Sequence, residues 1–279
     1  ICRYLRTDNV SVVSSGDAGL MIGLSALDLS KGGEVIVPSF TFNSTINAVL
    51  WNGLVPVFAD IGEETLNIDP VDVERKIGEK TCAILATHVF GNPCDVDALR
   101  SIADDHDLSL VFDAAHGYGA KYKKQKVGLL GDVEVFSFSG TKVVTSAEGG
   151  AVVTRNGSDT EKIRYARNYG YLEDYQSERI GLNGKISELE AALGVMTLPE
   201  VDECIEKRER VVDRYKSELQ GVGDIRFQKI EDGNKSAHKD FCIITSQREA
   251  LKSYLQKEGV GVKIYFHPCH LMSLFSKYG

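Results

Sequence analysis

The sequence predicts an α/β protein with a mainly parallel mixed sheet sandwiched by helices. Helical and strand patterns alternate between residue 10 and about residue 155, and such alternation implies crossover connections that return each strand in the same direction. The strand patterns are continuous apolar runs bounded by Gly and polar residues, which is typical of strands buried on both faces. These two observations define the expected large domain.

The individual elements follow from periodicity and from turn residues. Leu20, Leu24 and Leu27 recur at helical spacing after the turn SGDAGL at 15–20, and the pair Gly32-Gly33 ends that pattern. The expected order is a helix from 15 onward, a strand at 34–38, a helix near 45–51, a strand at 55–61, a helix at 71–77, a strand at 81–91, a helix at 95–107, a strand ending at Asp113, a strand ending at Lys142 and a short antiparallel partner at 151–155.

After residue 180 the pattern becomes helical and then mixed. Residues 186–198 predict a helix with small residues on one face, and 199–219 predict a long charged helix with Pro199 in its first turn. The charged helix carries one apolar stripe, formed by Val201, Ile205, Val212, Tyr215 and Leu219. Its charged residues then lie on the solvated face.

The last part of the chain predicts a β-α-β unit. Strands at 240–246 and 261–266 flank a helix at 248–259, as at the beginning of a smaller α+β domain. We therefore expect a large domain over 1–198 and the start of a small C-terminal domain over 199–279. Because the chain begins at Ile1 and ends in mid-pattern at Gly279, we expect this small domain to be incomplete.

Composition excludes several classes of function. The 279 residues carry a net charge of −8, which disfavours nucleic-acid binding because that binding needs a basic face. No apolar run reaches the roughly 18–20 residues that span a bilayer, and neither a P-loop nor a GxGxxG fingerprint occurs. The six cysteines are scattered without a CxxC pair, as expected for ordinary thiols in a reducing compartment such as the cytoplasm.

A lysine and an aspartate carry the strongest functional signal. Asp113 and Lys142 each stand where a buried apolar run ends, and ligands of open α/β sheets bind beyond the carboxyl ends of the strands. Pyridoxal phosphate (PLP) needs a lysine for a Schiff base and a carboxylate that keeps its pyridine nitrogen protonated. The pair therefore predicts a PLP enzyme, although an isolated lysine is usually a surface residue and an isolated aspartate is often a helix cap.

Two further features fit a phosphate group. The turn at Gly16, Asp17 and Ala18 opens a helix, where free amides and the helix dipole favour an anion; the same residues are also an ordinary N-cap signal. Ser137 precedes Lys142 closely and offers a hydroxyl, unless it is only a satisfied strand residue. The glycines at 19 and 23 indicate that this helix packs unusually close to a neighbour.

An aromatic and a histidine complete the candidate site. Phe42, with Phe40, follows the strand at 34–38 and could stack on a pyridine ring, although aromatics are more often core. His116 follows Asp113 and could reach the phenolic oxygen of the cofactor, although a lone histidine is usually structural. The run HPCH at 267–270 has no second pair to complete a zinc tetrahedron, so we expect no metal.

Taken together, the motifs resemble those of the DegT/StrS family of PLP-dependent sugar aminotransferases, which have the aspartate aminotransferase-like fold type I. The resemblance runs through nearly the whole chain. It is carried by SGDAGL (15–20), VIVPSFTFNST (35–45), VPVFADIGEETLNID (55–69), THVFGNPCDVDAL (87–99), FDAAHGYGA (112–120), SFSGTK (137–142), EGG (148–150), RNYGY (167–171), GLNGKISELEAALG (181–194) and the region of His270.

The resemblance implies a role for each candidate residue. Lys142 matches the Schiff-base lysine and Asp113 matches the partner of the pyridinium nitrogen. His116 matches a position that bonds the ring oxygen, and Phe42 matches the aromatic stacked on the ring. Ser137 matches part of the phosphate cradle. A lysine at 142 also separates the chain from the dehydratases of the family, which have histidine there.

The phosphate cradle is completed by two other parts of the chain. Gly16, Asp17 and Ala18 match its turn, and Asn183 matches an asparagine that reaches the cofactor of the neighbouring subunit, which implies a homodimer with shared sites. The family usually has Thr where Asp17 stands. A carboxylate beside a phosphate dianion is unfavourable, so Asp17 is expected to turn away and leave backbone amides to bind.

The implied reaction moves an amino group from glutamate to a keto group of a nucleotide-activated sugar, for polysaccharide or amino-sugar biosynthesis. The same motifs also permit a cyclitol or another keto compound as acceptor. A PLP-binding regulatory protein without turnover is an alternative from another class.

Overall fold

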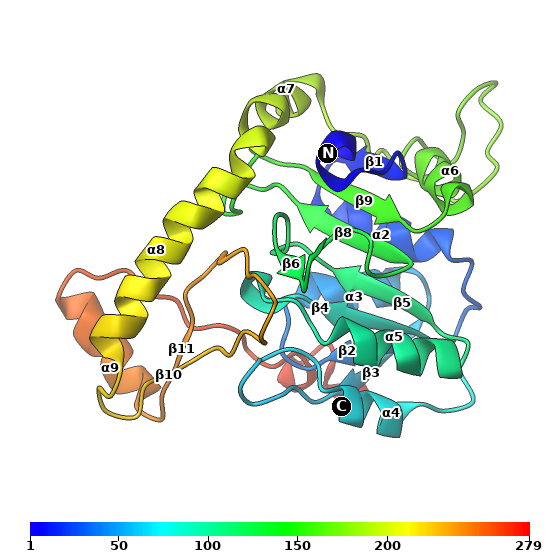
Figure 1. Ribbon diagram of the computed structural model, residues 1–279. Coiled ribbons are helices and arrows are strands. Elements are labelled where there is room, and N and C mark those ends of the chain that lie inside the picture. The colour runs from blue at the N-terminus through cyan, green and yellow to red at the C-terminus, as the bar shows by residue number, and fades with distance from the viewer.

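The computed structural model describes residues 1–279 and contains three layers around one main sheet (Figure 1). In sheet order the strands are β1 (Val10–Val13), β9 (Gly150–Thr154), β8 (Val133–Ser137), β5 (Ser109–Asp113), β4 (Thr81–Thr87), β2 (Glu34–Pro38) and β3 (Val55–Ala59). All neighbouring strands are parallel except at β9, which is antiparallel to both β8 and β1. The predicted mainly parallel mixed sheet, with an antiparallel partner near 151–155, is therefore confirmed.

Helices cover both faces of this sheet. The helices before the long α8 are α1 (Cys2–Leu5), α2 (Gly16–Ala26), α3 (Asn43–Trp51), α4 (Pro70–Lys76), α5 (Val96–Asp105), α6 (Gly157–Ala166) and α7 (Glu188–Thr197). Helices α2, α3 and α6 pack on one face, whereas α4 and α5 pack on the other. Each face buries its own apolar cluster, with Leu24, Ile46 and Val135 on the first face and Ile84, Phe112 and Phe136 on the second.

Helix α2 lies unusually close to the sheet, as its glycines predicted. A Cβ atom at Gly19 would stand 2.7 Å from Val135 Cγ1, and one at Gly23 would stand 2.9 Å from Val133 Cγ1. Real Cβ atoms do not approach side chains this closely, so any other residue would push the helix away. The start of α2 is thereby fixed against the end of β8.

The second part of the chain projects from this body. Helix α8 (Val201–Leu219) runs diagonally away from the sheet and leads to β10 (Arg226–Phe227), β11 (Ile243–Ile244) and α9 (Arg248–Lys257). The predicted stripe on α8 is buried at Val201, Ile205 and Val212. None of the helices combines the length and the apolar character that a bilayer crossing needs.

Three expectations about secondary structure need correction. The strand expected to end at Lys142 ends at Ser137, and Lys142 lies in the turn that follows. The strand expected at 261–266 does not form, because Tyr265 and Phe266 pack around the ring of Phe90 instead of pairing. The strand expected at 240–246 is reduced to β11, which pairs antiparallel with β10.

The last residues return to the main sheet. The backbone N–H of Cys269 donates to Ser39 O at 2.8 Å, and the side chains of Cys269 and Phe275 are buried in the apolar cluster of the first face. Residues at the end of the chain thus pack on the large domain. The division into domains at 198 and 199 stays a prediction.

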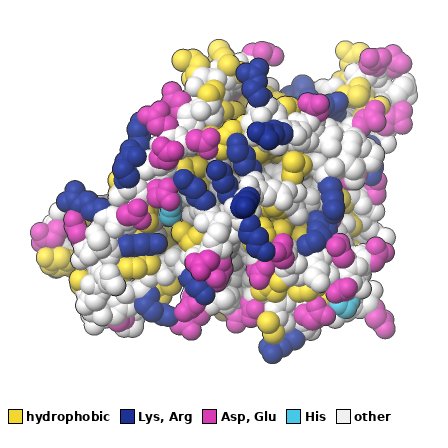
Figure 2. Space-filling view, in the orientation of Figure 1, with side chains coloured by type: hydrophobic (Ala, Val, Ile, Leu, Met, Phe, Trp, Pro, Cys, Tyr) yellow, Lys and Arg dark blue, Asp and Glu magenta, His cyan; other side chains and the backbone are white.

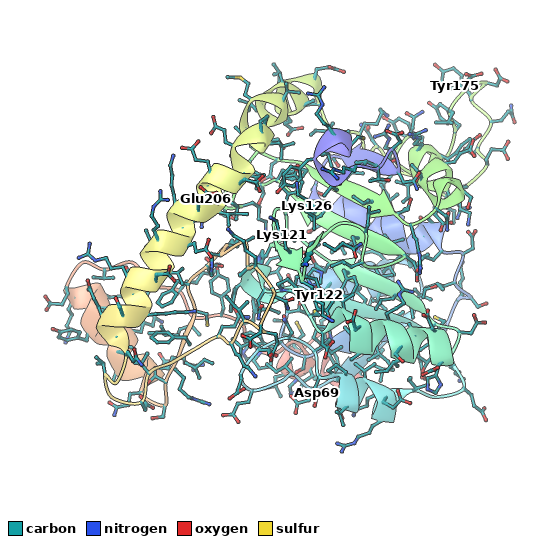
Figure 3. All side chains as sticks on the ribbon, in the orientation of Figure 1. Asp69, Lys121, Tyr122, Lys126, Tyr175 and Glu206 are labelled. Carbon is teal, nitrogen blue, oxygen red and sulfur yellow. The ribbon has the colours of Figure 1, made fainter.

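One face of the molecule gathers positive charge despite the negative net charge. Lys and Arg side chains lie over its middle (Figure 2), where Figure 3 places Lys121 and Lys126. Lys121 and Lys126 belong to a hairpin formed by β6 (Lys121–Tyr122) and β7 (Gln125–Lys126). Lys126 Nζ donates to Tyr4 O at 3.1 Å and lies 3.1 Å from the centre of the Tyr4 ring. This part of the charge therefore fastens α1 to the hairpin.

Candidate active site

The carboxyl ends of the parallel strands bring the candidate residues to one edge of the sheet. Asp113 is the last residue of β5, Ser137 is the last residue of β8, and Gly16 starts α2 just beyond β1. His116, Ser137 and Lys142 line the same small cavity. The structure thus brings together residues from three predicted motifs at the place where α/β sheets bind ligands.

Asp113 is a buried carboxylate with two hydrogen-bond donors. Asp113 is only 4% exposed. Thr45 Oγ1 donates to Oδ2 at 2.7 Å, and the Ala115 N–H donates to Oδ1 at 3.1 Å. Burial raises the pKa of Asp113, while the two donors and the charge of Lys142 act in the opposite direction. The carboxyl group therefore binds a proton more readily than an exposed aspartate does.

A chain of buried hydroxyl groups supports Asp113 from behind. Thr41 Oγ1 lies 2.8 Å from Thr45 Oγ1 and 3.0 Å from Thr87 Oγ1. Because Thr45 gives its proton to the carboxylate, it must accept from Thr41, and Thr41 must accept from Thr87. The three hydroxyl groups thus point their protons toward Asp113.

Lys142 is a half-buried amine near several charges. Its backbone N–H donates to Ser139 O at 3.0 Å, which closes the turn after β8. Burial lowers the pKa of Lys142, and Lys239 acts in the same direction. Asp113, Asp240 and Asp17 oppose this change. A lysine with a lowered pKa is neutral, and hence nucleophilic, at a lower pH than an exposed one.

His116 is held in one tautomer. Its Nδ1 accepts the backbone N–H of Phe90 at 3.2 Å, and the two rings stack. Burial lowers the pKa of His116 well below its ordinary value, and the charges of Lys142 and Lys239 lower it further. The imidazole is therefore neutral, so its hydrogen lies on Nε2 and can be donated to a ligand.

The start of α2 forms a tight cradle with Ser137. A Cβ atom at Gly16 would lie 2.9 Å from Ser137 Cβ, so only glycine fits there. The Ser15 hydroxyl accepts the N–H of Ala18 at 3.1 Å, whereas the N–H groups of Gly16 and Asp17 have no partner in the protein. Unpaired amides at a helix start are suited to an anion.

Asp17 is exposed at the same helix start, yet its charge acts on both Asp113 and Lys142. Its position therefore leaves it within electrostatic range of the site. A negative charge here opposes a phosphate dianion, although the backbone amides favour one.

Phe42 and Asn183 lie at the margin of this arrangement. Phe42 precedes α3 and is 56% exposed. Asn183 is exposed in an extended segment that pairs with Asn168. No contact joins Asn183 to Asp113 or Lys142 within the chain.

Sequence reasoning missed two residues of the site. Thr45 was assigned only to a helical stretch, and Lys239 was not singled out although its side chain is only 7% exposed. Thr45 is 68 residues from Asp113 in the sequence, so no local pattern identifies it as the hydrogen-bond donor to that carboxylate. Lys239 ends the polar run at 233–239, which gave no sign of burial either.

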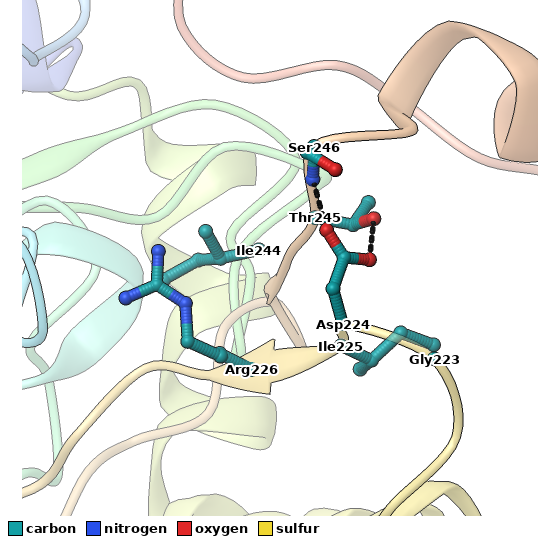
Figure 4. A pocket seen from close by; sticks show the side chains of 7 residues that line it. All are labelled: Gly223, Asp224, Ile225, Arg226, Ile244, Thr245 and Ser246. Atoms are coloured by element: carbon teal, nitrogen blue, oxygen red, sulfur yellow. Dashed lines mark hydrogen bonds between the residues drawn. The ribbon is translucent and has the colours of Figure 1, made fainter.

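A more open hollow lies elsewhere, beside the β10–β11 pair (Figure 4). Its volume is about 530 Å³. Both oxygens of Asp224 are already occupied, since one accepts the Thr245 hydroxyl and the other accepts the Ser246 N–H at 2.7 Å. The hollow thus lacks the buried lysine and carboxylate of the sheet edge, and we place the candidate site at that edge.

The fold and the site define the class of PLP-dependent transferases of fold type I. The model of the DegT/DnrJ/EryC1/StrS aminotransferase family matches residues 1–279, and the chain belongs to this family. The resemblance inferred from the sequence motifs is therefore confirmed.

Several similar proteins have names that refer to nucleotide sugars. GDP-perosamine synthase of Vibrio cholerae is 34% identical over 98% of this chain and 76% of its own length. The dTDP-3-amino-3,4,6-trideoxy-alpha-D-glucose transaminase of Streptomyces venezuelae is 34% identical over 98% of this chain and 73% of its own length. Among solved structures, S. venezuelae DesV in complex with a ketimine intermediate is 34% identical, with a TM-score of 0.95, over 99% of this chain and 75% of that one.

The buried charge of Asp113 generates a prediction about stability. In the cofactor-free protein, we expect Asp113→Asn to have a higher free energy of unfolding than the wild type at pH 7. The amide can accept from Ala115 and donate to Thr45, because the hydroxyl chain can reverse, and no charge is then buried.

The pH dependence tests the cause. Since the folded pKa of Asp113 is raised, the folded wild type binds the proton more tightly than the unfolded chain, and it gains stability as pH falls toward about 4. Urea unfolding of both proteins should show the advantage of Asn shrinking over that range. An advantage that is absent at pH 7, or that does not change with pH, would contradict the assigned burial cost.

The charge of Asp17 generates a second prediction. We expect Asp17→Asn to bind PLP about fivefold more tightly, since removing one charge near the phosphate is worth about 1 kcal/mol. The gain should decrease at high salt. Fluorescence titration with PLP measures it, with the exposed Asp8→Asn as a matched control. Equal affinities for all three proteins would show that Asp17 does not face the phosphate.

Proposed function

We propose that this chain is a PLP-dependent aminotransferase that moves an amino group from glutamate to a keto group of a nucleotide-activated sugar. The observation that carries the proposal is the convergence of a half-buried Lys142 and a buried Asp113 at one edge of the sheet. The names of two relatives, GDP-perosamine synthase and a dTDP-amino-sugar transaminase, support the sugar nucleotide as acceptor. Polysaccharide or amino-sugar biosynthesis would use the product.

The residues of the site fit the cofactor. The close approach of Gly16 to Ser137 and two unpaired amides form a cradle suited to a phosphate. When bound, PLP supplies an aldehyde that takes up an amine and a ring that accepts an electron pair. In the proposed arrangement, Ser137 and the Gly16 and Asp17 amides hold the phosphate, Ala18 shapes the turn through Ser15, and Phe42 covers the ring.

Lys142 is proposed to hold the cofactor and to move the proton. Because burial lowers the pKa of its amine, Nζ can be neutral at moderate pH and accept a proton from the α-carbon of the donor. The same Nζ would return that proton later in the transfer. Its position in a turn after β8, rather than within the strand, gives the side chain freedom to do both.

Asp113 and His116 are proposed to set the charge of the ring. The two donors on Asp113 fix the orientation of its carboxylate, which would keep the ring nitrogen of bound PLP protonated. The Nε2 hydrogen of His116 is proposed to bond the phenolic oxygen, because Nδ1 is occupied by Phe90. Thr45 acts as a positioning residue for Asp113.

We also propose a homodimer with shared sites. Large apolar side chains are exposed on both sides of Asn183: Ile180 is 88% exposed, Leu189 is 82% exposed and Val195 is 76% exposed. Tyr175 stands at the tip of the loop that projects before them (Figure 3). A second copy covering these side chains would bring Asn183 to the neighbouring phosphate. The six cysteines are all free, which supports the cytoplasm as the proposed location.

The first test is an absorption spectrum with PLP. We expect a band at about 410–430 nm that requires Lys142 and disappears when glutamate is added. Lys142→Ala should lose the band and slow the reaction with glutamate by at least about 100-fold, the scale of a lost acid–base group. The exposed Lys124→Ala serves as the control. If the wild type forms no such band, the aminotransferase proposal fails.

Loss of the α-deuteron from labelled glutamate separates the alternatives. Exchange in the wild type supports an enzyme, and bound PLP without any exchange would favour a regulatory protein. A screen of keto-sugar nucleotides against keto cyclitols then distinguishes the two acceptor classes, since only the true acceptor restores the visible band.

Mixing two inactive variants tests the shared site. Lys142→Ala and Asn183→Ala each damage one contributor, and a mixed dimer contains one site with both residues intact. Random mixing should therefore restore about one quarter of the wild-type activity, because half of the dimers are mixed and half of their sites are intact. No recovery, although affinity tags show that the subunits have mixed, would contradict sharing.

A further inference from the structure

Lys239 is a buried cation that the proposed roles leave unused. Its side chain is only 7% exposed, and it lies in the segment between β10 and β11, outside the main sheet. Lysine is rarely buried without a partner because desolvation of the ammonium is costly. A lysine in this position therefore needs a specific reason.

The partners of Lys239 do not use its full capacity. Nζ donates to Asp240 Oδ2 at 2.8 Å and to Tyr265 Oη at 3.3 Å. An ammonium group has three donors, and the third has no partner in the protein. Asp240 is itself partly exposed, with 27% of its side chain accessible, so another anion can approach the pair.

The backbone holds Lys239 against the candidate active site. Its N–H donates to Phe90 O at 3.0 Å, while the N–H of the same Phe90 donates to His116 Nδ1 at 3.2 Å. Arg208 Nη1 donates to Lys239 O at 3.0 Å. Lys239 and His116 are thus attached to opposite sides of one residue.

The charges of the pair reach the reacting amine. Lys239 acts on both Lys142 and His116, and Asp240 acts on Lys142 with the opposite sign. The other charges that act on Lys142 are those of Asp113 and Asp17. The ion pair therefore lies within electrostatic range of Lys142 Nζ, the amine proposed to hold the cofactor and to move the donor's proton.

We propose that Lys239 binds the α-carboxylate of the amino-acid donor, and that Asp240 occupies this position until the donor arrives. The inference rests on the proposed function and names a determinant of donor specificity. An incoming carboxylate exchanges with a carboxylate of the protein, so the net charge around the buried ammonium is preserved. Asp240 is then an internal competitor of the donor.

A carboxylate fits this position better than the diphosphate of the acceptor. The ammonium lies 5.4 Å from the centre of the Tyr265 ring, which packs against Phe90 and Phe266. One cation with one free donor matches a single negative charge, whereas a diphosphate needs several donors. In an α-amino acid the carboxylate is one carbon from the amine, which matches a cation whose charge acts on Lys142. In a nucleotide sugar several bonds separate the diphosphate from the keto carbon.

The test compares glutamate with its α-amide in the reaction of the PLP-loaded protein. Lys239→Met should weaken glutamate binding about 10- to 100-fold, the scale of a lost charged hydrogen bond, and should leave binding of the α-amide unchanged. Asp240→Asn should strengthen glutamate binding. Lys239→Arg, which keeps the charge, should retain most of the preference for glutamate over the α-amide.

A second readout requires no turnover. Only the neutral amine of Lys142 attacks the aldehyde of PLP, so the initial rate of band formation on adding PLP rises with pH, and the pH midpoint of this rate reports the pKa of Lys142. Without Lys239 the remaining Asp240 should raise this midpoint, and without Asp240 the remaining Lys239 should lower it. A purely structural role would not move the midpoint in opposite directions.

Equal losses for glutamate and the α-amide, or unchanged glutamate binding in both Lys239→Met and Asp240→Asn, would overturn the inference. If Lys239→Met does not fold, Asp240→Asn and Lys239→Arg decide the matter alone. Failure of the proposed function looks different: the wild type would then bind PLP and not react with glutamate at all.

Discussion

The site depends on one costly interaction, the burial of the Asp113 carboxylate at the end of β5. Burial alone would neutralise this group, and the donors from Thr45 and Ala115 act against that. Thr45 reaches Asp113 because α3 starts just after β2, and its hydroxyl is oriented in turn by Thr41 and Thr87. Because β2, β4 and β5 are neighbours in the sheet, the three threonines lie beside Asp113 and stabilise its carboxylate. This carboxylate is the group proposed to keep the ring nitrogen of the cofactor protonated.

The same edge of the sheet balances opposite charges over a short range. Lys142 lies among the negative charges of Asp113, Asp240 and Asp17, with Lys239 acting in the other direction. A single strong partner would fix the lysine in its charged form. Several partial influences together with burial leave its amine able to change protonation, as an acid–base group requires.

The sequence predicted the central sheet well because buried parallel strands are continuous apolar runs, and the runs that form β2, β4 and β5 were unambiguous. It also predicted the close packing of α2 from Gly19 and Gly23, since glycine in a helix interior has a local meaning. Residues 261–266 were wrongly predicted as a strand, because aromatic residues that pack around Phe90 give the same apolar sequence pattern as a strand. Thr45 and Lys239 were not predicted as site residues, because their contacts join segments that are distant in the sequence and no local pattern indicates such contacts.

The attachments of the segment that follows α8 have a mechanical consequence. The segment between the end of α8 and Cys269 is fastened at several places to residues that precede α8. Backbone hydrogen bonds join Lys229 to Glu64, Lys235 to Lys121 and Lys239 to Phe90, and Cys269 is bound to Ser39 and Thr41. The segment therefore cannot swing about a single hinge. Because one attachment is to Thr41, a member of the hydroxyl chain behind Asp113, a displacement of this segment would pull on the threonines that orient the carboxylate.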